Sequence, residues 1–80
     1  MNVQNALSVG AVPVSDRFID EYMPQANGDY VKVYLWLLRN AAREVTLSEA
    51  AGALMLTEGD VERAVKYWQE KGVLTMTGQE

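Results

Sequence analysis

The sequence predicts a mainly α-helical fold: a winged helix-turn-helix domain with a short N-terminal extension, made of a strand-like segment plus a short helix, and a small β-sheet. The main evidence lies in residues 46–76, where two short capped helices flank a tight turn and precede a strand-like run. A broad apolar arc over residues 30–43 predicts the central helix of the core. We expect residues 1–14 to be partly flexible or strand-like. Residues 15–80 should form the winged-helix domain, truncated within the wing.

Composition narrows the classes of function. Seven Lys and Arg against eleven Asp and Glu give the 80-residue chain a net charge of −4, whereas a compact duplex-DNA-binding domain usually has a basic footprint. The chain has no Cys or His to hold a structural metal, so we expect no metal, no cofactor and no enzymatic activity. Nothing resembles a signal peptide, and the longest apolar run, residues 33–38, is far shorter than the roughly 20 residues of a membrane span. We expect a cytoplasmic protein that does not bind membranes.

The strand-like segment of the N-terminal extension covers residues 7–14. Its run L-S-V-G-A-V-P-V is interrupted by Gly10 and Pro13, and Pro cannot donate to a β-ladder. Any strand here would therefore lie at an edge, where it either pairs with a second chain or folds back on its own domain. The candidates for oligomerisation are Leu7, Val9, Val12 and Val14.

Two helices are predicted before the helix-turn-helix. Ser15 should cap a short one over residues 16–23. Phe18, Ile19 and Tyr22 should lie on one face of this helix. The central helix should start at Asn27 or Asp29 and cover roughly residues 30–43. At 100° per residue, its apolar arc comprises Tyr30, Val31, Tyr34, Leu35, Leu37, Leu38, Ala41 and Ala42.

Threonines begin both helices of the helix-turn-helix. Thr46 has Glu49 three residues on, which completes a capping box, and Thr57 with Asp60 is a weaker version of the same device. The inward positions of these two helices are Leu47, Ala50, Ala51, Leu54, Val61, Ala64, Val65 and Trp68.

The end of the second helix and the wing are predicted from the residues that follow. Gly72 should take the left-handed conformation that ends the helix. Residues 73–76 should form a strand that pairs with Val45, and residues 77–78 should form the tip of the wing.

One candidate binding surface is the outward face of the second helix, with Arg63, Lys66 and Tyr67. These residues could read a DNA groove. Acidic residues outnumber basic ones on this helix, however, and would repel phosphates. A solvated or protein-contacting face, with ion pairs such as Glu62–Lys66, is the stronger interpretation.

The other candidate is a stripe on the central helix, formed by Lys32, Trp36, Arg39 and Arg43. A cationic track with one aromatic platform suits single-stranded nucleic acid better than a duplex. The favoured alternative is that Trp36 is covered, by the N-terminal segment or by a second subunit, with Arg39 stacked on it.

Two blocks of the sequence resemble the DnaD family of bacterial replication-initiation proteins. They are F-I-D-E-Y-M-P-Q-A-N-G-D-Y-V-K-V-Y-L-W-L-L and L-S-E-A-A-G-A-L-M-L-T-E-G-D-V-E-R-A-V-K-Y-W-Q-E-K-G-V-L, and the resemblance runs from about Val12 to Met76. It implies a winged-helix N-terminal domain that self-associates and helps to assemble the primosome, while a separate C-terminal domain carries much of the DNA binding. No active-site residues are implied.

The residues and the resemblance together predict a non-catalytic oligomerisation and protein-interaction module of a DnaD-like replication initiation protein. Its expected partners are further copies of the chain and other replication-initiation proteins, with DNA bound weakly or through a missing C-terminal domain. The alternative is a transcription regulator that reads duplex DNA with the helix over residues 58–71. Duplex binding that weakens steeply as salt rises would distinguish the regulator.

Overall fold

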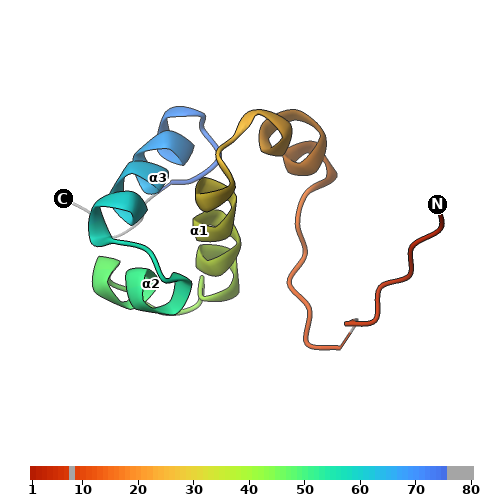
Figure 1. The fold of residues 1–80 in the computed structure, drawn as a ribbon, viewed down its shortest axis with the longest axis horizontal. Coiled ribbons are helices and arrows are strands. Elements are labelled where there is room, and N and C mark those ends of the chain that lie inside the picture. Colours follow the sequence, from red (N-terminus) through yellow and green to blue (C-terminus); the bar gives the residue numbers. More distant parts are fainter. Residues whose placement is uncertain (8, 76–80) are drawn as a thin grey trace.

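The computed structural model describes residues 1–7 and 9–75, and three α-helices form the body of this part of the chain. They are α1 (Gly28–Arg39), α2 (Leu47–Leu54) and α3 (Glu58–Glu70). α1 packs against both α2 and α3, and α2 packs against α3 (Figure 1). A π-helical turn, η1 (Phe18–Tyr22), and a 3-10 turn, η2 (Met23–Gln25), precede them. The prediction of a mainly α-helical domain is confirmed.

Both helices of the predicted helix-turn-helix begin at a complete capping box. Thr46 Oγ1 accepts a hydrogen bond from the Glu49 N–H at 3.1 Å, and Glu49 Oε1 accepts one from the Thr46 N–H at 3.0 Å. Thr57 and Asp60 form the same reciprocal pair at 3.0 and 3.1 Å. Each box satisfies N–H groups that the first helical turn leaves without a partner. Asp60 therefore caps α3 in the same way as Glu49 caps α2, which is more than the sequence predicted.

α1 ends at Arg39, earlier than predicted. The Asn40 side chain donates from Nδ2 to the Trp36 carbonyl at 2.9 Å, and the Asn40 N–H donates to the same carbonyl at 3.1 Å. A short polar side chain that bonds back to the helix in this way competes with the next helical turn. Ala41 and Ala42 lie beyond the helix and are exposed. Their predicted place in the core is wrong.

The buried face of α1 is rotated from the predicted one. Val33 is 0% exposed and Tyr34 is 7% exposed, whereas Leu35 is 43% exposed. The positions that pack in the core follow the i, i+3, i+4, i+7, i+8 pattern of a helix with neighbours on one side; they include Tyr30, Val33, Tyr34, Leu37 and Leu38. The prediction omitted Val33 and wrongly placed Leu35 inside. The apolar arc in the sequence is wider than the surface that the other helices cover.

The core consists of two clusters on either side of this stripe. Cluster 1 lies between the three α-helices and is built from small residues, Val33, Ala50, Ala51, Val61 and Ala64. Cluster 2 is aromatic and joins the π-helical turn to α1 and α3 through Phe18, Tyr34 and Trp68. The inward positions predicted for α2 and α3 are confirmed as buried or half-buried, except for Leu47, which is 39% exposed.

Trp68 is the centre of cluster 2. Its side chain is 0% exposed, and its ring centre lies 5.1 Å from that of Phe18 and 5.5 Å from that of Tyr34. Phe18 and Tyr34 stack with their ring centres 4.0 Å apart. Trp68 Nε1–H donates to the Tyr30 carbonyl at 2.8 Å, so the buried indole leaves no unpaired polar group.

The short helix after Ser15 is a π-helical turn, and this changes which residues it buries. Ser15 Oγ accepts a hydrogen bond from the Arg17 N–H at 3.1 Å, as a capping residue would. Phe18 is buried and Tyr22 is half-buried, as predicted. Ile19 is 42% exposed, so it does not share the buried face of Phe18 as predicted. The i→i+5 hydrogen bonding of a π-turn has a different period from the α-helix assumed from the sequence.

The β-structure of the predicted fold is not found among residues 1–7 and 9–75, which contain no strand. Residues 73–75 do not form a ladder with Val45. The Val73 and Leu74 N–H groups instead donate to the Trp68 carbonyl at 3.0 and 3.3 Å, and both side chains pack on cluster 2. Their backbone donors are thus used to close the end of α3. Met76 and the predicted wing tip at 77–78 lie outside the described residues.

The predicted strand at the N-terminus is also absent from its described residues. We call residues 1–14, without the undescribed Ser8, the arm. It leaves the helical body as an irregular extended segment (Figure 1). It neither folds back as a strand nor finds one to pair with, because the body described here offers no β-edge.

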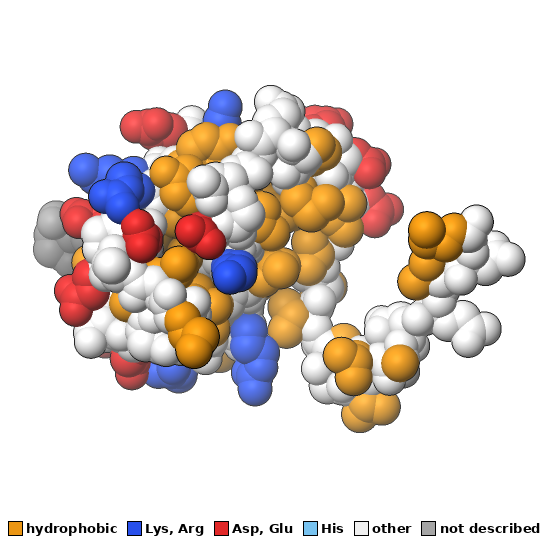
Figure 2. All heavy atoms as spheres, viewed as in Figure 1, with side chains coloured by type: hydrophobic (Ala, Val, Ile, Leu, Met, Phe, Trp, Pro, Cys, Tyr) orange, Lys and Arg blue, Asp and Glu red, His pale blue; other side chains and the backbone are white. Residues whose placement is uncertain are grey.

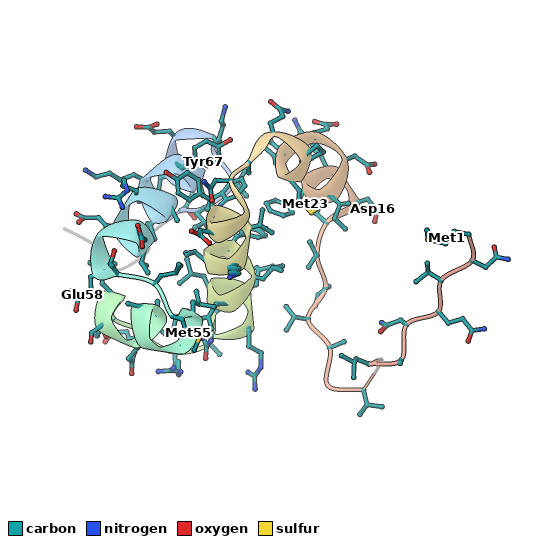
Figure 3. All side chains as sticks on the ribbon, in the orientation of Figure 1. Met1, Asp16, Met23, Met55, Glu58 and Tyr67 are labelled. Carbon is teal, nitrogen blue, oxygen red and sulfur yellow. The ribbon has the colours of Figure 1, made fainter. Side chains whose placement is uncertain are left out.

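The residues that end α2 and follow α3 take left-handed conformations. Gly72 has φ +76° and follows α3, as predicted. Met55 has φ +59° and ends α2 in the same conformation, which the sequence did not suggest. A left-handed residue with a side chain costs about 1–2 kcal/mol. The Met55 side chain is 92% exposed (Figure 3).

Candidate interaction surfaces

The outward face of α3 was predicted to offer Arg63, Lys66 and Tyr67 to a partner. Arg63 forms an ion pair with Asp60 within the same helix. Lys66 is exposed, and no ion pair with Glu62 or another described acidic residue is formed. Four acidic residues lie on the same helix as these two cations: Glu58, Asp60, Glu62 and Glu70. Little positive charge is therefore left free on this face to neutralise phosphates.

The Tyr67 ring packs on two other aromatic rings of the domain and contributes only in part to the outward face of α3. Its ring centre lies 5.0 Å from that of Tyr30 and 4.9 Å from that of Trp68. Lys71 Nζ lies 5.4 Å from the Tyr67 ring centre, in a cation–π position. The side chain is half-buried, so a partner would contact only its edge.

The Asp60 carboxylate lies among groups that favour its ionised form. The pKa of Asp60 is lowered, first by the hydrogen bond from the Thr57 N–H, then by the Thr57 side chain, and also by the Arg63 guanidinium. Each of these groups favours the ionised carboxylate. Asp60 is thus committed to capping α3.

This gives a prediction for the acid unfolding of the domain. Because the folded-state pKa of Asp60 lies below the ordinary value of about 3.9, the unfolded state takes up the proton first as the pH falls. The stabilisation is present above about pH 4 and is lost as the pH falls through the folded-state pKa. We expect Asp60→Asn to flatten part of the decrease in the free energy of unfolding between about pH 5 and pH 2.

The measurement is urea denaturation across that range of pH. Glu62→Gln is the matched control, because Glu62 is an exposed residue of the same helix without an ion pair among those described. Equal slopes for the Asp60→Asn, Glu62→Gln and unsubstituted chains would contradict the prediction.

The predicted stripe of Lys32, Trp36, Arg39 and Arg43 is only partly assembled. Lys32 and Arg39 are exposed on α1. Trp36 is half-buried because it packs against cluster 1 of its own domain, and not because the arm covers it. Arg43 lies beyond the end of α1 and forms an ion pair with Glu49 at 3.5 Å. The four residues therefore do not form a continuous cationic track.

The arm exposes most of the residues predicted to mediate oligomerisation. Leu7 is 83% exposed and Val9 is 94% exposed, while Val12 is 38% exposed. Val14 is half-buried against cluster 2, where the arm joins the helical body. Residues 1–14 contain no charged side chain. The arm is therefore an uncharged apolar segment in contact with water.

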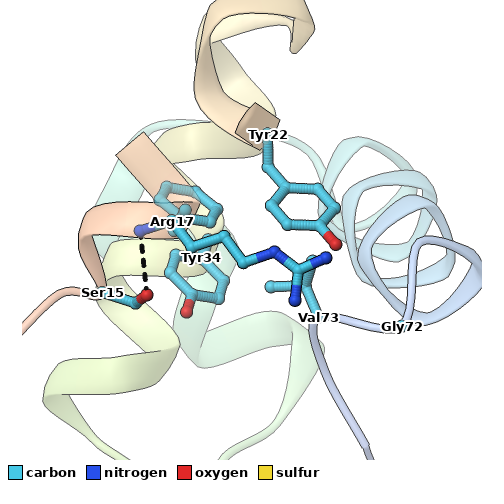
Figure 4. Close-up of a pocket in the computed structure, with 7 residues that line it drawn as sticks. Ser15, Arg17, Tyr22, Tyr34, Gly72 and Val73 are labelled. Atoms are coloured by element: carbon cyan, nitrogen blue, oxygen red, sulfur yellow. Dashed lines mark hydrogen bonds between the residues drawn. The ribbon is translucent and has the colours of Figure 1, made fainter. Parts of the chain in front are cut away.

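A shallow depression of about 210 Å³ lies where the arm joins the body. Its lining consists of Ser15, Arg17, Phe18, Tyr22, Tyr34, Gly72 and Val73 (Figure 4). Arg17 lies over the Tyr22 ring at 5.8 Å, and its Nε pairs with Glu21 at 3.0 Å. Burial raises the pKa of the Tyr34 phenol above its ordinary value.

The described residues contain neither a cluster of metal ligands nor a membrane-spanning helix. No group of three or more Asp, Glu, His or Cys side chains converges there as the ligands of a metal ion would. No helix in the same residues has both the length and the apolar character needed to cross a bilayer.

Comparisons with known proteins add no relative. No protein-family model, no curated protein and no solved structure matches the chain. The resemblance to the DnaD family therefore depends on the residues quoted above alone.

Leu35, Ile19 and Met23 are exposed apolar residues that the sequence-based choice of surfaces left out. Leu35 was assigned to the core, Ile19 to a face shared with Phe18, and Met23 to no surface. All are exposed, at 43%, 42% and 37%. Their i, i+3, i+4 spacing to neighbouring charged residues was visible in the sequence and could have indicated two mixed surfaces.

Proposed function

We propose that this chain is a non-catalytic assembly module of a DnaD-like DNA replication initiation protein. It self-associates through the arm and contacts other replication-initiation proteins during primosome assembly. The place in replication, and the cytoplasmic location that goes with it, come from the resemblance. Self-association is supported by the arm.

The exposure of the arm is the observation that carries the proposal. Leu7 and Val9 are almost fully exposed, on a segment that lies away from the helical body (Figure 1). Covering such side chains contributes roughly 25 cal/mol per Å² of apolar surface removed from water. An uncharged extended segment also has free backbone N–H and C=O groups, which a second extended segment can pair with.

A helix-turn-helix core is part of the proposal. α2 and α3 are joined by a tight turn at residues 55–57, and α1 packs across both. This order and this packing support the proposed helix-turn-helix. The alternative function, reading of duplex DNA by α3, has less support. Arg63 is already paired with Asp60, and the chain has a net charge of −4.

The test is the molar mass in solution over a concentration series. We expect the mass of the unsubstituted chain to rise with concentration and that of Leu7→Asp with Val9→Asp to remain lower. Gln4→Asp with Asn5→Asp is the matched control, since it adds the same charge to the arm without removing apolar surface. A chain that stays monomeric throughout would contradict the proposal.

Titration with duplex DNA distinguishes the assembly module from the alternative, a transcription regulator. An assembly module should bind duplex DNA weakly at about 50 mM salt and not detectably at about 200 mM. Tight, sequence-selective duplex binding, lost on Lys66→Ala, would favour the regulator.

A further inference from the structure

One exposed face of α1 combines two cations with two apolar residues. Lys32, Leu35, Trp36 and Arg39 have the i, i+3, i+4, i+7 spacing of a single helix face. We call these four residues the basic face. Lys32 and Arg39 have no ion-pair partner among the described residues. Leu35 is 43% exposed, and Trp36 adds the outer part of its ring.

The segment around η1 has exposed residues of the opposite charge beside exposed apolar ones. These are Asp16, Ile19, Asp20 and Met23, which we call the acidic face. Ile19 is 42% exposed and Met23 is 37% exposed. Neither aspartate forms an ion pair with a described residue. Figure 2 shows acidic side chains beside apolar ones on this segment, at the upper right of the molecule, and Figure 3 labels Asp16 and Met23 there.

The two faces cannot meet within one chain in this fold. η1 docks on α1 by stacking Phe18 against Tyr34. At 100° per residue, Tyr34 lies about 200° around α1 from Lys32, on the opposite side of the helix. The side of α1 that holds the acidic segment in place is therefore the side away from the basic face.

We infer that the acidic face of one copy of the chain docks on the basic face of a second copy. Each face sets two apolar side chains beside two like charges, so contact would bury the apolar residues and bring opposite charges together. Buried apolar area supplies affinity in such a contact. The charges set the register of the contact and prevent two faces of the same charge from associating. This inference rests on the proposed self-association but uses a surface separate from the arm.

A second copy of the chain fits the basic face better than single-stranded nucleic acid does. Trp36 is half-buried against cluster 1, so its ring is not free on both sides for stacking. Arg43, which would extend a phosphate track, is paired with Glu49. Leu35 gives the face an apolar member that a phosphate backbone would not use.

A charge-swap experiment in the full chain tests the docking. Lys32→Glu with Arg39→Glu should weaken self-association at least about tenfold, because like charges then oppose each other. Asp16→Lys with Asp20→Lys should do the same. An equimolar mixture of the two variants should recover association, because each now carries the face that the other has lost. Lys66→Glu with Lys71→Glu is the control for net charge, with both changes in or just after α3.

Several results would overturn the inference. Unchanged association in both charge-reversed variants would do so, as would failure of the mixture to recover when circular dichroism shows both variants folded. If Asp16→Lys with Asp20→Lys does not fold, the salt dependence of the unsubstituted chain decides. The docking requires association to weaken as salt rises from about 50 to 500 mM. Oligonucleotide binding that is lost in Lys32→Glu with Arg39→Glu, at unchanged molar mass, would assign the basic face to nucleic acid instead.

The same series distinguishes this inference from the proposed function. If only Leu7→Asp with Val9→Asp abolishes association, the arm stands as the interface and the face-to-face docking is wrong. If only the charge reversals abolish it, the docking stands and the arm is not the interface.

Discussion

Replacing Trp68 with Ala should lower the free energy of unfolding by about 3–5 kcal/mol. The side chain is 0% exposed and touches both other members of cluster 2. Its removal leaves a cavity where α1, α3 and the η1 segment meet, and it leaves the Tyr30 carbonyl without the donor now at 2.8 Å. Small domains have a total stability of only about 5–15 kcal/mol. The loss therefore takes a large share of the stability, and the temperature of thermal unfolding should fall markedly.

Two comparison variants separate the causes of this loss. Trp68→Phe keeps most of the ring but removes Nε1–H, so it should cost about 1–3 kcal/mol. Trp36→Ala is the matched control for loss of an indole, because Trp36 is only half-buried and should cost much less than Trp68→Ala. Urea denaturation followed by circular dichroism measures all three. Equal losses for the two Trp→Ala variants would show that cluster 2 is not the centre of the core.

Replacing Phe18 with Ala should also cost about 3–5 kcal/mol, with a more local consequence. Phe18 is 3% exposed and supplies the stacked contact to Tyr34 that holds η1 on the helical body. Its loss should release the segment before α1. Ile19→Ala is the control, because Ile19 is 42% exposed and a surface change of this kind usually stays within about 0.5 kcal/mol.

The titration of Tyr34 reports this release directly. Burial raises the pKa of Tyr34, and Phe18→Ala uncovers its ring. We expect the pKa of Tyr34 to fall towards its ordinary value in the folded variant, as measured by ultraviolet absorbance of the phenolate. An unchanged titration together with unchanged amide exchange in residues 16–25 would show that η1 is held by other contacts.

The sequence constrains the candidate surfaces less than it constrains the fold, for an electrostatic reason. The sequence shows how many cations a surface has but not which carboxylates they meet. Arg63 and Arg43 were chosen as binding residues, and both form ion pairs within the chain. Lys32 and Arg39 were chosen on the same grounds and have no described ion-pair partner. The positions of Asp60 and Glu49 in the folded chain are what distinguish the paired arginines from the two cations without a described partner.

The sequence by itself determined the features that depend on neighbours along the chain. The caps at Thr46 and Thr57 and the left-handed Gly72 follow from contacts within a few residues. The helical pattern of Val61, Ala64 and Trp68 likewise predicts their burial.

Only the tertiary structure decided the features that depend on distant parts of the chain. The apolar arc of α1 is wider than the surface that α2 and α3 cover, so the sequence leaves open which of its residues are buried. The packing of α2 and α3 buries Val33 and leaves Leu35 exposed. Val73 and Leu74 have strand propensity, but their backbone donors close the end of α3 and their side chains cover cluster 2. Propensity is a weak preference, and burial against a specific neighbour overrides it.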